Sequence, residues 1–263
     1  MPGPPQTKHM QSPAESATPT TPPANGRRAG GATRVRRRRS GWSPPRAARV
    51  RAIRDKLRAT YGRPEHQPHR RAIDEIVRTI LSQHTNDLNR DRAFNGLVER
   101  FGDWASVRDA PVSAVEEAIR PGGLAKQKAP RIQAVLAALG DPPDADWLEH
   151  AGREQALSFL TSLPGVGRKT AACVQIFSWG LPEIPVDVHV YRVGGRLGLF
   201  RRNASFEEAH DEMLAITDPR DAYELHVNLI RHGRQICRPK PRCGECGLRR
   251  ACPWYREQGQ SAR

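Results

Sequence analysis

The chain has 263 residues, of which 43 are Lys or Arg and 28 are Asp or Glu, so its net charge is +15 at pH 7. A chain of this length can bury one large hydrophobic core or two smaller ones. The positive charge indicates a polyanionic partner, because cationic side chains on phosphates release condensed counterions. No run of about eighteen apolar residues is present, so the sequence predicts no membrane-spanning helix and no membrane partner.

The first segment, residues 1–44, is rich in Pro, Gly, Ser, Thr and Arg. Such a composition cannot bury enough apolar area to order the chain, so we expect a disordered basic arm. Its run "RVRRRR" (Arg34–Arg39) could contact phosphates or only keep the arm solvated, and the sequence leaves both interpretations open.

From residue 43 onward, apolar residues recur at intervals of three and four, and no alternating strand pattern competes with this period. Gly, Pro and Asp punctuate the periodic stretches. The sequence therefore predicts an all-α fold of short helices, with apolar faces at 50–57, 73–81, 94–101, 115–119, 132–139, 157–163 and 225–230.

The segment "LPGVGRKTAAC" (residues 163–173) follows a helical stretch, so its glycines join two helices. It lacks the preceding strand of a dinucleotide motif and the adjacent Gly-Lys pair of a phosphate-binding P-loop. We expect a helix-hairpin-helix in which Pro164 ends the first helix, Gly165 and Gly167 permit the turn, and the second helix begins near Arg168. Free N–H groups there can bind phosphate without reading a base.

Downstream, "IPVDVHVYRVGGRLGL" places Asp187 after a proline-led turn and before a helical run. The plain interpretation is a helix N-cap. An N-cap carboxylate that accepts backbone N–H bonds stays ionised, so Asp187 could also stabilise a cationic transition state. A partly desolvated amine such as that of Lys169 could act as a nucleophile beside it.

Four of the five cysteines lie within sixteen residues in the pattern C-x5-C-x2-C-x5-C, at Cys237, Cys243, Cys246 and Cys252. Four thiolates can ligate either zinc or a 4Fe-4S cluster. Zinc sites usually combine two short cysteine pairs, whereas only one C-x2-C is present, so the spacing favours 4Fe-4S over zinc. Lys240 and Arg242 in this loop could contact a phosphate backbone or only solvate the loop.

Together, the hairpin, the aspartate and the cysteine loop resemble the endonuclease III family of DNA base-excision glycosylases, from about residue 50 to residue 256. The resemblance implies that "LPGVGRKTA" carries the nucleophile, Lys169, and that "VDxHVxR" carries the catalytic aspartate, Asp187, eighteen positions later. "GGLAKQKA" (residues 122–129) looks like the family segment "GxxxxKA". Gly165, Val166, Gly167 and Arg168 would then form the DNA-binding hairpin.

Two positions depart from the family pattern. The first cysteine loop has five residues where the family usually has six. "ILSQHTND" resembles the family's "LSxQTxD". In the family a glutamine often enters the gap left by the flipped base, but here His84 occupies that position and Gln83 lies one position earlier. We therefore assign His84 and Gln83 as DNA-contact candidates.

The resemblance also implies two helical lobes with DNA between them. A six-helix lobe would span 66–181, a cluster-bearing lobe would join 45–65 to 182–256, and 257–263 would form a tail. The cluster would be structural and would position the basic loop.

The implied function is a bifunctional glycosylase and abasic-site lyase that removes oxidised pyrimidines from damaged double-stranded DNA in base excision repair. It would act as a monomer, through a Schiff base and β-elimination. Two alternatives stay open: a monofunctional glycosylase for mismatched adenine, thymine or uracil, and a non-catalytic DNA-binding protein. We expect a cytoplasmic, nucleoid-associated protein, or a nuclear or mitochondrial one if the source is eukaryotic.

Overall fold

The computed structural model describes residues 42–261, so nearly all of the predicted basic arm lies outside the described residues. The described chain is helical and contains no strand, which confirms the predicted all-α fold. None of its helices is both long and apolar enough to cross a membrane. The α-helices are α1 (Ala47–Tyr61), α2 (Ala72–Leu81), α3 (Asp87–Phe101), α4 (Trp104–Asp109), α5 (Val112–Ala118), α6 (Ala125–Ala138), α7 (Arg153–Ser162), α8 (Arg168–Cys173), α9 (Val188–Leu197), α10 (Phe206–Ile216), α11 (Ala222–Gln235) and α12 (Pro253–Ser261).

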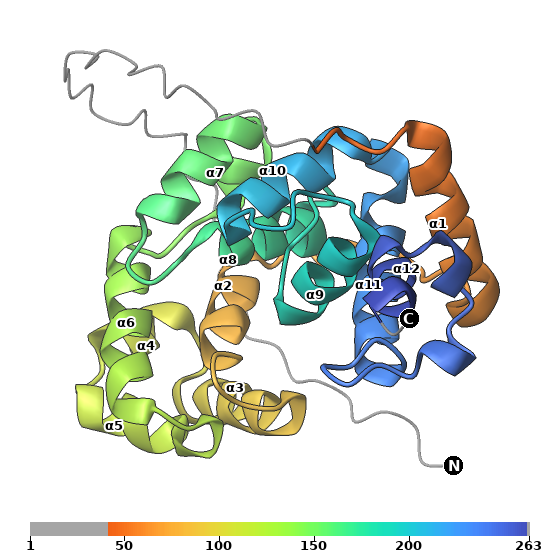
Figure 1. Ribbon diagram of the computed structural model, residues 1–263. Helices are drawn as coiled ribbons and strands as arrows, with labels where there is room; N and C mark the ends of the chain where they lie inside the picture. Colours follow the sequence, from red (N-terminus) through yellow and green to blue (C-terminus); the bar gives the residue numbers. More distant parts are fainter. Residues whose placement is uncertain (1–41, 262–263) are drawn as a thin grey trace.

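Two hydrophobic cores organise these helices. The first draws its buried residues from positions 72–179, on α2 to α8 and their connections. The second joins α1 to positions 176–248, so segments far apart in the sequence pack together. In Figure 1, α2 to α6 occupy one side of the molecule and α1, α9, α11 and α12 the other. The predicted lobe limits stay a prediction, and Ile176, inside the predicted first lobe, packs in the second core.

The hairpin between α7 and α8 has the local backbone that its sequence predicts. α7 ends at Ser162, Leu163 is extended before Pro164, and α8 begins at Arg168. Gly165 has φ +74°, where a side chain would be strained. Gly167 differs from expectation, because its extended backbone (φ −92°, ψ −178°) is open to any residue. Only the first glycine is therefore required by the turn.

The chain ends in a loop and a helix. After α11, residues 237–252 form a loop that contains two short 3-10 turns, Cys243–Glu245 and Arg249–Ala251. Helix α12 continues to Ser261, so positions 257–261, expected as a tail, are helical.

Candidate active site and cysteine loop

A cavity of about 460 Å³ opens where the two cores meet. Lys169 from α8 and Asp187 at the start of α9 both line it, so the structure brings together the two residues that the sequence singled out. The remaining wall comes from α2, α3, α9 and α11 and includes charged groups of both signs: Glu75, Arg78, Asp87, Arg90 and Arg234. The cavity therefore offers a charged, water-accessible space beside a lysine and a carboxylate.

Asp187 is the N-cap of α9. Its Oδ1 accepts hydrogen bonds from the backbone N–H groups of His189 (2.9 Å) and Val190 (2.7 Å). Two such bonds fix the direction of the carboxylate at the cavity edge. The N-cap interpretation from the sequence is confirmed, and it is compatible with a role in the cavity.

Lys169 lies in the first turn of α8, one turn before Cys173, which also lines the cavity. Burial raises the pKa of the Cys173 thiol to about 12, and the neighbouring charge of Lys169 acts against this rise. A thiol with so high a pKa stays neutral and is a poor nucleophile. On this wall, Lys169 rather than Cys173 is therefore the candidate nucleophile.

His226 of α11 also lines the cavity, and no sequence motif points to it. Its Nδ1 is 2.9 Å from the carbonyl oxygen of Pro185, and its ring meets Phe177 edge-on, with centroids 5.8 Å apart. Burial lowers the pKa of His226, so the ring is neutral and Nδ1 is its donor. The imidazole therefore supplies a neutral polar wall near Lys169 and Asp187.

The four hairpin residues predicted to bind DNA have different environments. Val166 is buried in the first core. The guanidinium of Arg168 is directed at the fully buried carboxylate of Glu183, with an N–O distance of 3.0 Å. Gly165 and Gly167 are exposed, and a Cβ at Gly167 would meet nothing within 4 Å. The hairpin can therefore offer backbone N–H groups to a close phosphate, while the Arg168 side chain stabilises the turn.

The segment between α2 and α3 carries the other predicted DNA contacts. His84 is exposed and has φ +53°, a left-handed conformation that is uncommon for residues other than glycine, although histidine adopts it more readily than most. Gln83 is half-buried, and its Oε1 accepts a hydrogen bond of 2.9 Å from Arg131 of α6. Leu124, just before α6, is 44% exposed at φ +51°, and sequence reasoning missed it.

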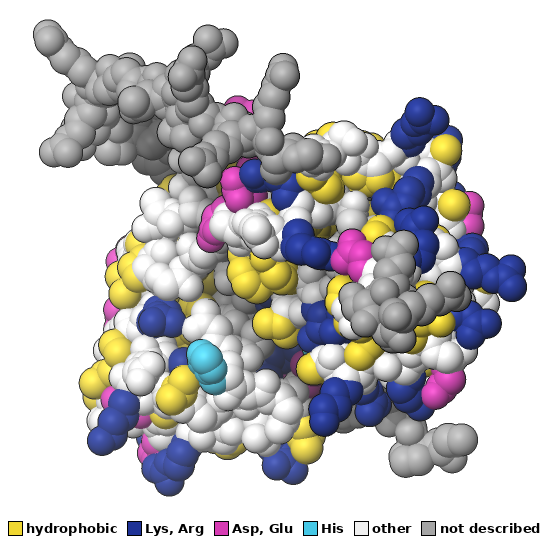
Figure 2. Space-filling view, in the orientation of Figure 1, with side chains coloured by type: hydrophobic (Ala, Val, Ile, Leu, Met, Phe, Trp, Pro, Cys, Tyr) yellow, Lys and Arg dark blue, Asp and Glu magenta, His cyan; other side chains and the backbone are white. Residues whose placement is uncertain are grey.

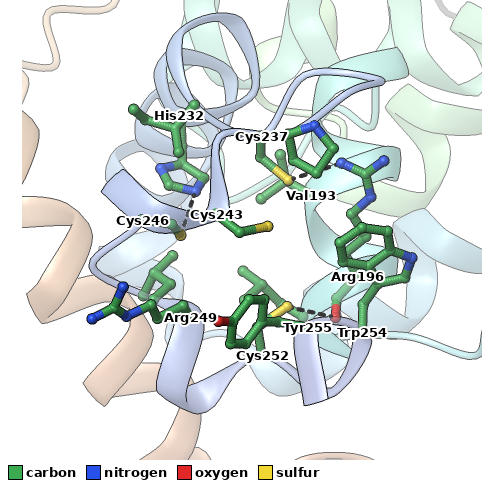
Figure 3. Close-up of a pocket in the computed structure, with 14 residues that line it drawn as sticks. Val193, Arg196, His232, Cys237, Cys243, Cys246, Arg249, Cys252, Trp254 and Tyr255 are labelled. Carbon is green, nitrogen blue, oxygen red and sulfur yellow. Dashed lines mark hydrogen bonds between the residues drawn. The ribbon is translucent and has the colours of Figure 1, made fainter. Parts of the chain in front are cut away.

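The cysteine loop forms a separate, small cavity beside α9 and α11. Figure 3 shows that the side chains of Cys237, Cys243, Cys246 and Cys252 surround one space. Two nitrogen groups lie near their sulfurs: Arg196 Nη1 is 3.3 Å from Cys237 Sγ, and His232 Nε2 is 3.5 Å from Cys246 Sγ. Lys240 and Arg242 are exposed on this loop, and Arg242 pairs with Glu245 at 3.2 Å.

Known DNA repair proteins are similar to this chain in sequence and in fold. Residues 77–219 match the family model of the HhH-GPD superfamily base excision DNA repair proteins. Endonuclease III of Thermotoga maritima is 32% identical over 188 residues, 70% of this chain and 84% of that protein. The chain belongs to the endonuclease III family.

Two solved endonuclease III structures share the fold, at 27% identity over 82% of this chain and 99% of theirs. One is a non-covalent DNA complex (TM-score 0.70) and the other a trapped covalent DNA intermediate (TM-score 0.69). As a member of the endonuclease III family, this chain is a DNA glycosylase and abasic-site lyase of base excision repair. The enzyme class predicted from the sequence is confirmed, and the non-catalytic alternative is not supported.

The chemistry of the endonuclease III cysteine loop suits a metal cluster. Within the described residues, no three His, Cys, Asp or Glu side chains converge on a point that could hold one metal ion. The four sulfurs instead stand around a shared space lined by Leu248, Trp254 and Tyr255. Four cysteine sulfurs around one space have the chemistry to ligate a metal centre, either zinc or an iron–sulfur cluster.

Proposed function

We propose that this endonuclease III family member removes oxidised pyrimidines from damaged double-stranded DNA and then cuts the strand at the abasic site. The observation that carries this proposal is the meeting of Lys169 and Asp187 at one cavity of about 460 Å³. A cavity of this size can take an extruded base and its sugar.

DNA binding would begin with charge. The net charge of +15 attracts the phosphate backbone, and Figure 2 shows Lys and Arg side chains over the half of this face formed by α1, α11 and α12. The exposed backbone N–H groups at Gly165 and Gly167 would donate hydrogen bonds to a DNA phosphate. Lys240 and Arg242, on the cysteine loop, would contact the phosphate backbone of the DNA. We propose that the protein binds DNA and acts on it as a monomer.

Base extrusion would follow from the exposed groups around the segment between α2 and α3. His84 is free to enter the stack and Gln83 lies beside it, while the apolar side chain of Leu124 is exposed at a neighbouring turn. Apolar and polar side chains that enter a base step offset the cost of unstacking. These groups would fill the gap while the target nucleotide occupies the cavity.

The chemistry assigns different roles to the two catalytic residues. The amine of Lys169 attacks C1′ of the sugar, and the glycosidic bond breaks with its electron pair going to the base, which leaves with a proton that the lysine nitrogen loses. Asp187 stabilises the positive charge that develops on the sugar. The C1′–O4′ bond then breaks, O4′ takes the remaining proton of the lysine nitrogen, and the nitrogen is left double-bonded to C1′ as a Schiff base. A proton leaves C2′, its C–H electron pair forms a C2′=C3′ double bond, and the C3′–O bond breaks with release of the 3′ phosphate.

We further propose that Cys237, Cys243, Cys246 and Cys252 ligate a 4Fe-4S cluster in preference to zinc. Such a cluster would cross-link the loop that carries Lys240 and Arg242, and it supplies structure rather than bond breaking. Iron and acid-labile sulfide in stoichiometric amounts would support this assignment, whereas stoichiometric zinc would contradict it.

Substrate choice can be tested with three duplexes that are otherwise identical. One contains thymine glycol, one an abasic site and one a G·T mismatch. We expect base release and strand cleavage on the first and cleavage on the second. Base release from the mismatch without strand cleavage would instead favour the monofunctional alternative. Cleavage of the abasic duplex alone would keep the lyase and reject oxidised pyrimidines as the substrate.

A further inference from the structure

The segment between α2 and α3, residues 82–86, is anchored at both ends. At its start, the buried Nζ of Lys128 donates to the carbonyl oxygens of Leu81 (2.7 Å) and Gly122 (2.8 Å). At its end, Asn86 caps α3 by accepting from the N–H of Asn89 at 2.9 Å. Fixed ends confine any adjustment of this insertion segment to its middle, where Gln83 and His84 lie.

The middle of the insertion segment is held by one side chain from α6. Arg131 lies one turn after Lys128, and its Nη1 donates to Gln83 Oε1 at 2.9 Å. This bond joins positions 48 residues apart in the sequence. It is charge-assisted, so it is stronger than a bond between two neutral groups.

The same arginine lies against the hairpin. A Cβ built on Gly165 would come within 2.2 Å of Arg131 Cδ and 2.4 Å of its Nε. The aliphatic stem of Arg131 therefore fills the space that the missing side chain of Gly165 leaves. Arg131 thus touches both the turn proposed to bind phosphate and Gln83, the neighbour of His84, which is proposed to enter the DNA.

We propose that Arg131 is a positioning residue that couples the hairpin to the insertion segment. A phosphate seated on the hairpin fixes the backbone at Gly165, and the stem of Arg131 transmits that position to Gln83. Gln83, and His84 beside it, are thereby aligned with the base step next to the gripped phosphate. This inference rests on the proposed function and adds to it a residue that contacts neither the sugar nor the leaving base.

The coupling predicts a selective defect. An abasic site has no base to extrude, so it depends little on the insertion segment, whereas an intact lesion must be unstacked. Loss of Arg131 should therefore slow lesion excision and leave the lyase reaction largely unchanged.

The test combines Arg131→Met, Gln83→Ala and the double variant in single-turnover reactions with saturating enzyme. Excision of thymine glycol, extrusion reported by 2-aminopurine next to the lesion, and borohydride trapping on an abasic duplex are measured. Lys126→Met is the matched control, because it removes an exposed cation from the same helix.

We expect each single variant to excise the lesion about tenfold more slowly and with a weaker extrusion signal. Arg131→Met should keep abasic trapping within about twofold of wild type. The double variant should be no slower than the slower single variant, because both remove one coupled unit. Arg131→Lys, which keeps a donor, should recover part of the rate and serves as the test if Arg131→Met does not fold.

Three results would overturn the coupling: unchanged excision in Arg131→Met, multiplied defects in the double variant, or an equal loss of abasic trapping. An equal effect of Lys126→Met would assign Arg131 to general phosphate attraction. Failure of the wild-type protein on both duplexes would refute the proposed function rather than this coupling.

Discussion

Acidification should destabilise the fold through His210, a histidine of α10 that is 1% exposed. Its Nε2 accepts a hydrogen bond of 2.8 Å from the backbone N–H of Val186, which directly precedes Asp187. Its Nδ1 is 2.7 Å from the carbonyl oxygen of Phe206. Only the neutral ring with its proton on Nδ1 satisfies both bonds. A proton on Nε2 would place its N–H against the N–H of Val186, beside Asp187.

Burial lowers the pKa of His210 from 6.5 to about 4, and the charge of Arg168 contributes in the same direction. Between pH 6.5 and pH 4 this histidine is protonated in the unfolded chain but not in the folded chain. The stability that its neutral ring contributes is therefore fully present above pH 6.5 and is lost as the pH falls toward 4. Linkage over this window predicts a loss of about 2 kcal/mol at pH 5 relative to pH 8 from this residue.

The assay is urea unfolding at pH 8 and pH 5 for wild type, His210→Gln and His150→Gln. His210→Gln should be less stable at pH 8, but its further loss at pH 5 should be about 2 kcal/mol smaller than that of wild type. His150 is exposed, so its replacement should keep the full wild-type loss. If His210→Gln keeps that full loss too, the buried neutral ring of His210 is not what makes the stability depend on pH.

Three further variants test the supports of the site. Lys128→Met removes two donors to buried carbonyls and should lower the free energy of unfolding by about 3 kcal/mol in urea titrations, whereas Lys126→Met should change it by less than about 0.5 kcal/mol. Glu183→Gln removes the fully buried carboxylate that pairs with Arg153 and Arg168, and it should lower the free energy of unfolding by about 3 kcal/mol in the same assay. An unchanged free energy would show that these ion pairs do not stabilise the fold. Cys243→Ser should lose bound iron in elemental analysis while Cys173→Ser keeps it, and equal iron in both would contradict the assigned ligands.

Features set by local chemistry could be predicted from the sequence. Pro164 and Gly165 fix the backbone of the hairpin, and Asp187 caps the helix that follows it. The helical period of the apolar residues likewise gives the all-α fold, because each amphipathic face must be buried. Gly167 shows the limit even locally: its backbone does not require glycine, and the absent side chain leaves open space instead.

Features set by packing between distant segments could not be predicted. Arg131 reaches Gln83 across 48 positions, and Lys128 reaches the carbonyl of Leu81 across 47. Neither arginine nor lysine at helical spacing signals a buried or bridging role, because both are usually solvated. His226 faces the cavity only because α11 packs against α9. Contacts of this kind form only when the cores assemble. The periodicity of the sequence shows which face of a helix is apolar, but not which helix packs against it.

The proposed chemistry depends on Lys169 as the nucleophile beside Asp187. Borohydride trapping on thymine glycol and abasic duplexes, with DNA affinity measured in parallel, tests it most directly for wild type, Lys169→Ala and Lys126→Ala. Wild type and Lys126→Ala should form a covalent adduct on both duplexes, and Lys169→Ala should form none while its affinity stays within about threefold. A Lys169→Ala protein that still forms the adduct at the wild-type rate would contradict the account.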